Sequence, residues 1–181
     1  MFEQISGLSY VDDIITTDQE QQIVNYIDQQ TWNMSLKRRT QHYGYEYSYT
    51  AKSVAKTTTP LGGPIKQIAT WLDSEGIINP TQCIVNEYLK NQGISKHTDA
   101  KSFGPIIVSV SLLSPCNMVF TQNDQTIIMC LKPRSMLVLS QEARYQWKHE
   151  IKTTSTIHDG DTIIQKPDDY RRLSLTFRTL S

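Results

Sequence analysis

The chain has 181 residues, enough for one domain that buries a core without disulfides or a structural metal. It carries 18 basic and 18 acidic side chains, so its formal charge is zero and no overall field draws it to a polyanion or an anionic membrane. The three cysteines are an odd number without CxxC spacing, which indicates a reducing compartment. No apolar run reaches the roughly 18 residues of a membrane span, so we expect an intracellular protein, cytoplasmic or nuclear, without membrane contact.

The first part of the chain predicts two helices. Thr17 and Glu20 have the spacing of a capping box, and apolar residues follow at helical spacing, so a helix is expected over about residues 18–30. A second helix is expected from Pro64, which suits the first turn because it lacks an N–H, to about Gly76.

Beyond the second helix the apolar pattern changes from helical to alternating. Short expected strands separated by turn residues are typical of a β-sandwich or jelly roll. These strands cover residues 83–89, 106–113, 118–121, 126–131, 136–140, 147–151 and 173–178. Residues 50–63, rich in Thr and Lys, predict a mobile surface loop. We therefore expect a mainly β (α+β) fold.

One domain is expected to span residues 1–181. In it, residues 81–181 form a double-stranded β-helix (jelly-roll) core. Residues 1–80 supply two N-terminal helices packed on that core and a segment that forms a lid over the substrate.

Three side chains form a candidate metal site. His97 and Asp99 are two residues apart, so an extended chain places both on one face. Such a pair alone is a weak signal, and a surface hydrogen bond is the usual explanation. His149 follows about fifty residues later on an expected strand, where a jelly roll can return it to the pair, and the three then form a facial triad. His42, in a basic aromatic segment, and His158, in a polar loop, are poorer candidates.

The last expected strand predicts an anion site. Arg172, Ser174, Thr176 and Arg178 alternate with apolar residues and share one face. An inward arginine is costly unless it meets an anion, and a dicarboxylate matches the guanidinium fork. An exposed strand with solvated arginines is the alternative. A zinc hydrolase could use the same triad, but it leaves the arginines unexplained and needs a general base that we do not find.

These residues resemble the motifs of the AlkB family of Fe(II)/2-oxoglutarate-dependent dioxygenases. The matching motifs are Asn86-x-Tyr88 leading to His97-x-Asp99, Arg144-x4-His149, and Arg172-x-Ser174-x-Thr176-x-Arg178. The resemblance covers most of the chain. It implies Fe(II) on the triad, O2 as oxidant and ascorbate as a possible reductant. It also implies 2-oxoglutarate on Asn86, Tyr88, Arg172, Ser174 and Arg178.

Residues 36–47 resemble most the branch of the family that hydroxylates a wobble uridine in tRNA. Two positions depart from the family pattern. Ser174 stands where the family usually has Asn. Lys101 stands where bacterial-type repair enzymes carry a carboxylate, and an ammonium cannot accept a hydrogen bond from a base.

The resemblance implies a modified or alkylated base in RNA or DNA as substrate. Cations followed by aromatic rings suit a phosphate backbone and a flipped base. The candidate substrate-binding residues are Lys37, Arg38, Arg39, His42, Tyr43, Tyr45, Tyr47 and Lys101. A tyrosine-rich hairpin packed on the core, with solvated cations, explains the same pattern. The same oxidation of a protein side chain or small molecule is the alternative function. We expect a monomer, with an accessory RNA-binding partner as one route to tRNA.

Overall fold

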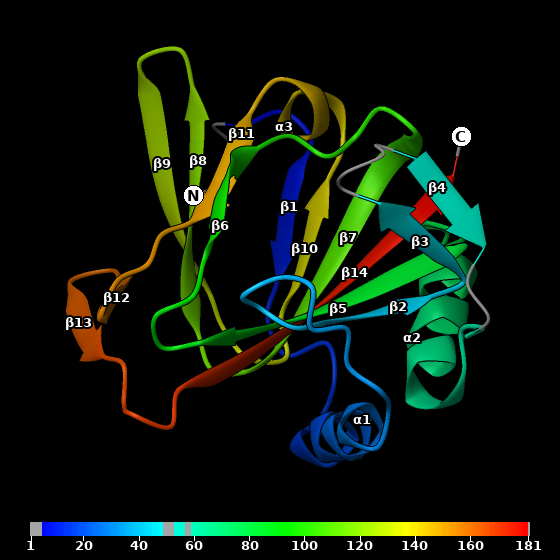
Figure 1. The fold of residues 1–181 in the computed structure, drawn as a ribbon. Helices are drawn as coiled ribbons and strands as arrows, with labels where there is room; N and C mark the ends of the chain where they lie inside the picture. Colours follow the sequence, from blue (N-terminus) through cyan, green and yellow to red (C-terminus); the bar gives the residue numbers. More distant parts are fainter. Residues whose placement is uncertain (1–4, 49–52, 57–58, 181) are drawn as a thin grey trace.

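The computed structural model describes residues 5–48, 53–56 and 59–180. Two antiparallel sheets face each other (Figure 1), one with the strand order β1-β10-β7-β14-β5-β2 and one with the order β6-β11-β8-β9. Two hairpins, β3-β4 and β12-β13, lie beside them. In chain order the elements are β1 (Leu8–Val11), α1 (Thr17–Asp28), β2 (Thr40–Tyr43), β3 (Tyr45–Ser48), β4 (Ser53–Lys56), α2 (Gly63–Ser74), β5 (Gln82–Leu89), β6 (Ile94–His97), β7 (Phe103–Leu113), β8 (Cys116–Gln122), β9 (Gln125–Leu131), β10 (Met136–Leu139), α3 (Gln141–Tyr145), β11 (Lys148–Ile151), β12 (Thr156–Asp159), β13 (Thr162–Gln165) and β14 (Arg171–Leu180).

Both expected N-terminal helices are present. The capping box of α1 lies one residue earlier than predicted: Thr16 is the N-cap, and its side chain and backbone exchange hydrogen bonds with Gln19. Glu20 does not cap the helix because its carboxylate accepts from Leu113 N and from Arg134. In α2, a proline stands in the first turn, and the residues at helical spacing are buried as expected.

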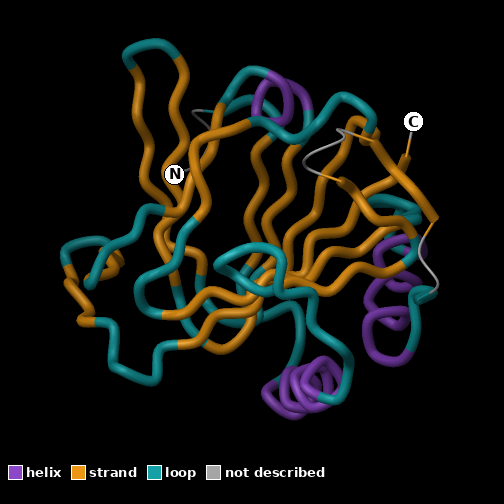
Figure 2. Tube along the Cα trace, viewed as in Figure 1, coloured by secondary structure: helices purple, strands orange, loops and turns teal. Residues whose placement is uncertain are grey.

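The helices pack on the outer face of the large sheet, while the small sheet covers its inner face (Figure 2). The alternation along β14 separates these two sides. Leu173, Leu175 and Phe177 join the core beneath the helices. Ser174 and Arg178 instead line a cavity between the sheets. The helix-covered core thus fixes which face of β14 the polar side chains occupy.

The mainly β fold with a jelly-roll core is confirmed. Several short elements were not predicted: β1, β2, β3, β4, β6, β12, β13 and α3. The loop expected over residues 50–63 is wrong for Ser53–Lys56, which pair with β3 as strand β4. Residues 50–52 and 57–58 lie outside the described part of the chain. Among the described helices, none has the length and apolarity that a membrane crossing needs.

Candidate metal centre

The two histidines of the predicted triad lie opposite each other in the small sheet. Strands β6 and β11 pair in a register that sets His97 against His149, and their ring centroids are 4.5 Å apart. Asp99 follows β6 and turns its carboxylate toward the same point. One ligand atom from each residue lies within 4.8 Å of the others. Strand pairing thus brings together two residues that are distant in sequence.

The surroundings of the triad favour an ionised Asp99 and an uncharged His149. Burial alone would raise the pKa of Asp99, but the nearby Arg178 guanidinium and the imidazoles hold it below its ordinary value. Arg178 Nη2 donates to Asp99 Oδ1, and Asp99 Oδ2 lies 3.6 Å from His149 Nε2. Burial lowers the pKa of His149 to about 4, against the opposing pull of Asp99. His149 is therefore uncharged at neutral pH and can offer a lone pair.

The tautomer of His97 is fixed by a backbone carbonyl. His97 Nδ1 lies 2.7 Å from Ser95 O, and because that oxygen can only accept, Nδ1 carries the proton. Nε2 is left free to coordinate a metal. Two imidazoles and one carboxylate fit Fe(II) at an open site, whereas a structural zinc site uses four protein ligands. Within the described ranges, no other group of three His, Cys, Asp or Glu side chains has this geometry.

A cavity of about 510 Å³ opens from the triad toward the solvent. Its walls are mostly apolar, and four of the five side chains predicted to bind 2-oxoglutarate line it. These four are Asn86, Tyr88, Ser174 and Arg178. The polar groups therefore lie on one wall, contributed by the neighbouring strands β5 and β14.

Arg172 lies deeper than that wall. It is 1% exposed, and its guanidinium carbon lies 5.4 Å from the centre of the Tyr88 ring, which does line the cavity. Nη2 donates to Ser111 Oγ, but Nε and Nη1 have no hydrogen-bond partner among the described residues. Buried donors without an acceptor are costly. An anion that enters past Tyr88 would satisfy them, so these residues fit a carboxylate ligand.

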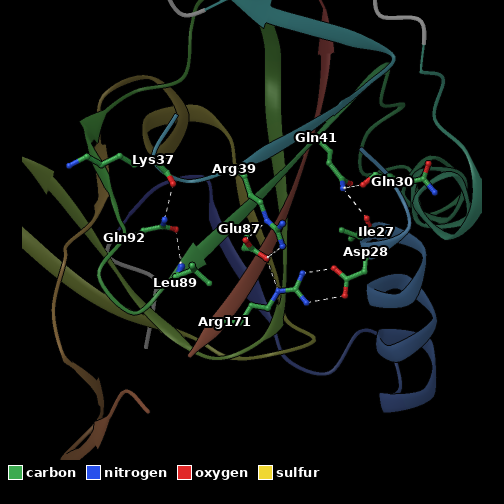
Figure 3. Close-up of polar contacts among 10 residues, drawn as sticks. All are labelled: Ile27, Asp28, Gln30, Lys37, Arg39, Gln41, Glu87, Leu89, Gln92 and Arg171. Carbon is green, nitrogen blue, oxygen red and sulfur yellow. Dashed lines mark hydrogen bonds and ion pairs between the residues drawn. The ribbon is translucent and has the colours of Figure 1, made fainter. Parts of the chain in front are cut away.

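The predicted substrate-binding segment does not form one surface. Arg38 lines the cavity and donates from Nε to Asn86 Oδ1 at 3.1 Å. Lys37 is exposed. Arg39 turns to the other face of β5, where it binds the Glu87 carboxylate (Figure 3) and lies over the ring of Trp32 at 4.3 Å.

The following aromatic residues also separate, because alternate side chains of β2 face opposite ways. Tyr43 is 1% exposed in the core beneath the helices and donates its hydroxyl to Gln41 Oε1. His42 is half-buried, with Nε2 lying 3.1 Å from Thr40 Oγ1. Tyr45 is half-buried at the start of β3, and the side chain of Tyr47 lies outside the described part of the structure.

Three further charged residues differ in their relation to the cavity. Lys101 is exposed in the turn before β7 and is not part of the cavity wall. Lys96 lines the cavity beside His97, although its sequence context gave no signal. Glu87 is buried and binds both Arg39 and Arg171, and Arg171 in turn binds Asp28 of α1 (Figure 3). Only the alternation of β5, with Asn86 and Tyr88 on the cavity face, could have placed Glu87 on the opposite face.

Comparison with known proteins identifies the family of this chain. Residues 9–178 match the model of the 2OG-Fe(II) oxygenase superfamily. An Arabidopsis thaliana protein named "Alkylated DNA repair protein ALKBH8 homolog" is 33% identical over 96% of this chain and 58% of its own length. The Macaca fascicularis "tRNA (carboxymethyluridine(34)-5-O)-methyltransferase ALKBH8" is 38% identical over 80% of this chain and 24% of its own length. The chain thus spans only part of these relatives.

A solved structure shares the fold. The structure of OsALKBH1 superposes with a TM-score of 0.70 at 14% identity, covering 96% of each chain. The family implies Fe(II), 2-oxoglutarate and O2, and the triad of this chain fits the iron. The chain belongs to the 2OG-Fe(II) oxygenase superfamily and, by the relatives that it resembles, to its AlkB-like members.

Proposed function

We propose that this dioxygenase oxidises a modified or alkylated base in RNA or DNA, by hydroxylation or oxidative demethylation, and that a tRNA wobble uridine is the first candidate. The observation that carries this proposal is the metal triad at the inner end of a cavity with cations at its mouth. The proposal also takes residues 1–181 as a single domain.

The residues divide between the metal and the co-substrate. His97, Asp99 and His149 hold Fe(II), which with 2-oxoglutarate and O2 supplies the oxidation of a substrate C–H bond. One carboxylate of 2-oxoglutarate satisfies the buried N–H groups of Arg172, next to Tyr88. Asn86, Ser174 and Arg178, which line the cavity wall, orient the rest of the co-substrate.

The cavity mouth supports a nucleic-acid substrate. Arg38 and Lys96 line the cavity, and Lys37 is exposed on the segment that carries Arg38. We take these three cations to mark the cavity mouth, where they would meet a phosphate backbone. A base must leave its stack to reach a metal inside such a cavity. Exposed Lys101, and His42 and Tyr45 on strands β2 and β3, are further candidates for contacts with the strand.

The names of relatives favour the same substrate class. Besides the tRNA methyltransferase, a Caenorhabditis elegans relative that is 28% identical is named "DNA N6-methyl adenine demethylase". This chain spans 58% and 24% of the lengths of the first two relatives, and an accessory RNA-binding partner is part of the proposal. So are a monomeric state and an intracellular site of action, cytoplasmic or nuclear.

The test is turnover with defined substrates. The full chain is incubated with Fe(II), 2-oxoglutarate and ascorbate, together with total tRNA, methylated RNA and DNA oligonucleotides, or a peptide library. Succinate is measured and the products are analysed by mass spectrometry. We expect substrate-dependent succinate and an oxidised or demethylated nucleoside that the His97→Ala protein does not form. Turnover of peptides alone would favour the alternative function, oxidation of a protein side chain.

A further inference from the structure

A fully buried arginine lies directly behind the proposed metal ligand Asp99. Arg144 is in α3, and its residue is 2% exposed. Its guanidinium donates to four main-chain carbonyls: Nη1 to Asp99 O at 2.9 Å, Nη2 to Ala100 O at 2.7 Å and to Phe103 O at 3.3 Å, and Nε to Gly104 O at 3.3 Å. All four carbonyls belong to residues 99–104, the segment that leads from β6 into β7.

This side chain adds hydrogen bonds to a segment whose first part lies outside the regular strands. Residues 98–102 belong to no helix or strand, and Phe103 N donates a main-chain hydrogen bond to Ala100 O. Buried carbonyls need a donor. Arg144 provides donors to several of them at once, so a side chain 45 residues away from Asp99 in sequence sets the path of the chain just after it.

Two arginines therefore act on Asp99 at different groups. Arg178 binds the carboxylate, whereas Arg144 binds the main-chain oxygen. Arg144 has no carboxylate partner within hydrogen-bond distance in the described structure, and its burial lowers the pKa of the guanidinium, against the effect of the Asp99 charge. A buried cation held by neutral carbonyls is a poor source of net stability. A role in placing Asp99 explains why the charge is there.

The helix that carries Arg144 is itself fixed to the beginning of the described chain. Ser140 N donates to Gly7 O at 2.9 Å, and Ala143 N donates to Ser6 O at 3.0 Å. Gly7 has a φ of +81°, and a Cβ atom there would lie 2.1 Å from Ser140 O, so only glycine fits. The base of Arg144 is thus held in place, which makes the guanidinium a firm support for Asp99.

We propose that Arg144 is a positioning residue of the metal centre. It holds the main chain after Asp99 so that the carboxylate meets the two histidines, and metal affinity depends on it although it does not touch the metal. This inference rests on the proposed iron site but not on the proposed nucleic-acid substrate. Partners of metal ligands that act in this way contribute about 10- to 100-fold to metal affinity.

The test is Co(II) binding by the metal-free full chain, followed by titration of the cobalt absorption bands. Arg144→Met and the milder Arg144→Lys, which keeps the buried charge and the stem but cannot reach four carbonyls, should each bind Co(II) about 10- to 100-fold more weakly, with altered bands. Urea unfolding of the metal-free proteins gives their stability. Arg134→Met is the matched control, because Arg134 binds Asp13 and Glu20 away from the cavity. It should lower stability without changing Co(II) affinity.

A double-mutant comparison separates positioning from general structure. If Arg144 acts through Asp99, Arg144→Lys should cause no further loss of Co(II) affinity in an Asp99→Ala background. A folded Arg144→Lys protein with unchanged affinity and bands, or one whose loss persists without Asp99, would overturn the proposal. A wild-type protein that binds Co(II) but oxidises no nucleic acid would refute the proposed substrate and leave the role of Arg144 standing.

Discussion

The inner end of the cavity and its mouth use the same kinds of side chain in different ways. At the inner end, His97 and His149 are set by the pairing of two strands, and Arg178 meets the one carboxylate it faces. At the mouth, Arg38 and Arg39 are neighbours in sequence, yet one faces the cavity and the other binds Glu87 on the far side of β5. A run of like charges therefore predicts little about a site until the strand that carries it is known.

Loss of a metal ligand at the inner end should reduce activity the most. His149→Ala removes a ligand that no other described histidine can replace. Loss of a mere partner of a metal ligand costs about 10- to 100-fold, so metal-dependent succinate formation should fall by more than about 100-fold. Iron content and succinate yield measure this. His158→Ala is the control, because His158 is exposed on β12 and is not part of the cavity wall. Equal activity of the two variants would contradict the triad.

The buried carboxylate of Glu87, which binds Arg39 behind the cavity wall, should contribute to the stability of the fold. Glu87→Gln leaves Arg39 and Arg171 without the buried charge they share, so the free energy of unfolding should fall by about 3 kcal/mol in urea. Metal affinity should stay unchanged. Asp168→Asn, which removes an exposed ion pair with Lys90, should leave the urea midpoint where it was. If Glu87→Gln proves as stable as the wild type, the ionic support is unimportant.

The inner end should also respond to acid. His149 has a pKa of about 4 in the folded metal-free protein, below the ordinary 6.5, so only the unfolded chain takes up a proton between these values. Stability is therefore fully present above pH 6.5 and falls as the pH drops. The loss between pH 8 and pH 5 should be about 2 kcal/mol. His149→Gln should remove this part of the pH dependence, which urea unfolding at each pH will measure.

Lys37 should make a small contribution to the binding of a nucleic-acid substrate. Lys37→Gln should raise the KM for an RNA or DNA substrate by about threefold and reduce the salt slope of binding by about one, because one phosphate contact is lost. Lys66→Gln is the matched control, since Lys66 is exposed on α2, and α2 covers the other face of the large sheet. A salt slope unchanged by Lys37→Gln would remove this residue from the proposed interface.

The sequence predicted the inner end well because its signals are local and periodic. Alternation along β14 placed Arg172 and Ser174 on one face, and the spacing of His97 and Asp99 placed both beside one point. His149 required only that a jelly roll bring β11 beside β6. The chemistry of each side chain then limited what the group could bind.

The mouth could not be predicted in the same way. Tyr43 belongs to the apolar core because β2 joins the edge of the large sheet next to α1 and α2, a long-range packing that residue type does not reveal. Arg39 turns away from the cavity because Glu87 alternates with Asn86 on β5. The hydrogen bonds from Arg144 to residues 99–104 could not be predicted either, because their acceptors are main-chain carbonyls, which every residue has.

The pairing of His97 with His149 has a consequence for motion. These residues lie on the small sheet, while Arg178, which holds Asp99, lies on the large one. An ion bound by the triad would therefore join β6 to β11 and, through the hydrogen bond between Asp99 and Arg178, connect both to the large sheet. Amide protons of β6 and β11 should exchange with solvent more slowly when the ion is bound. Their exchange rates would then measure how much of the protein carries metal.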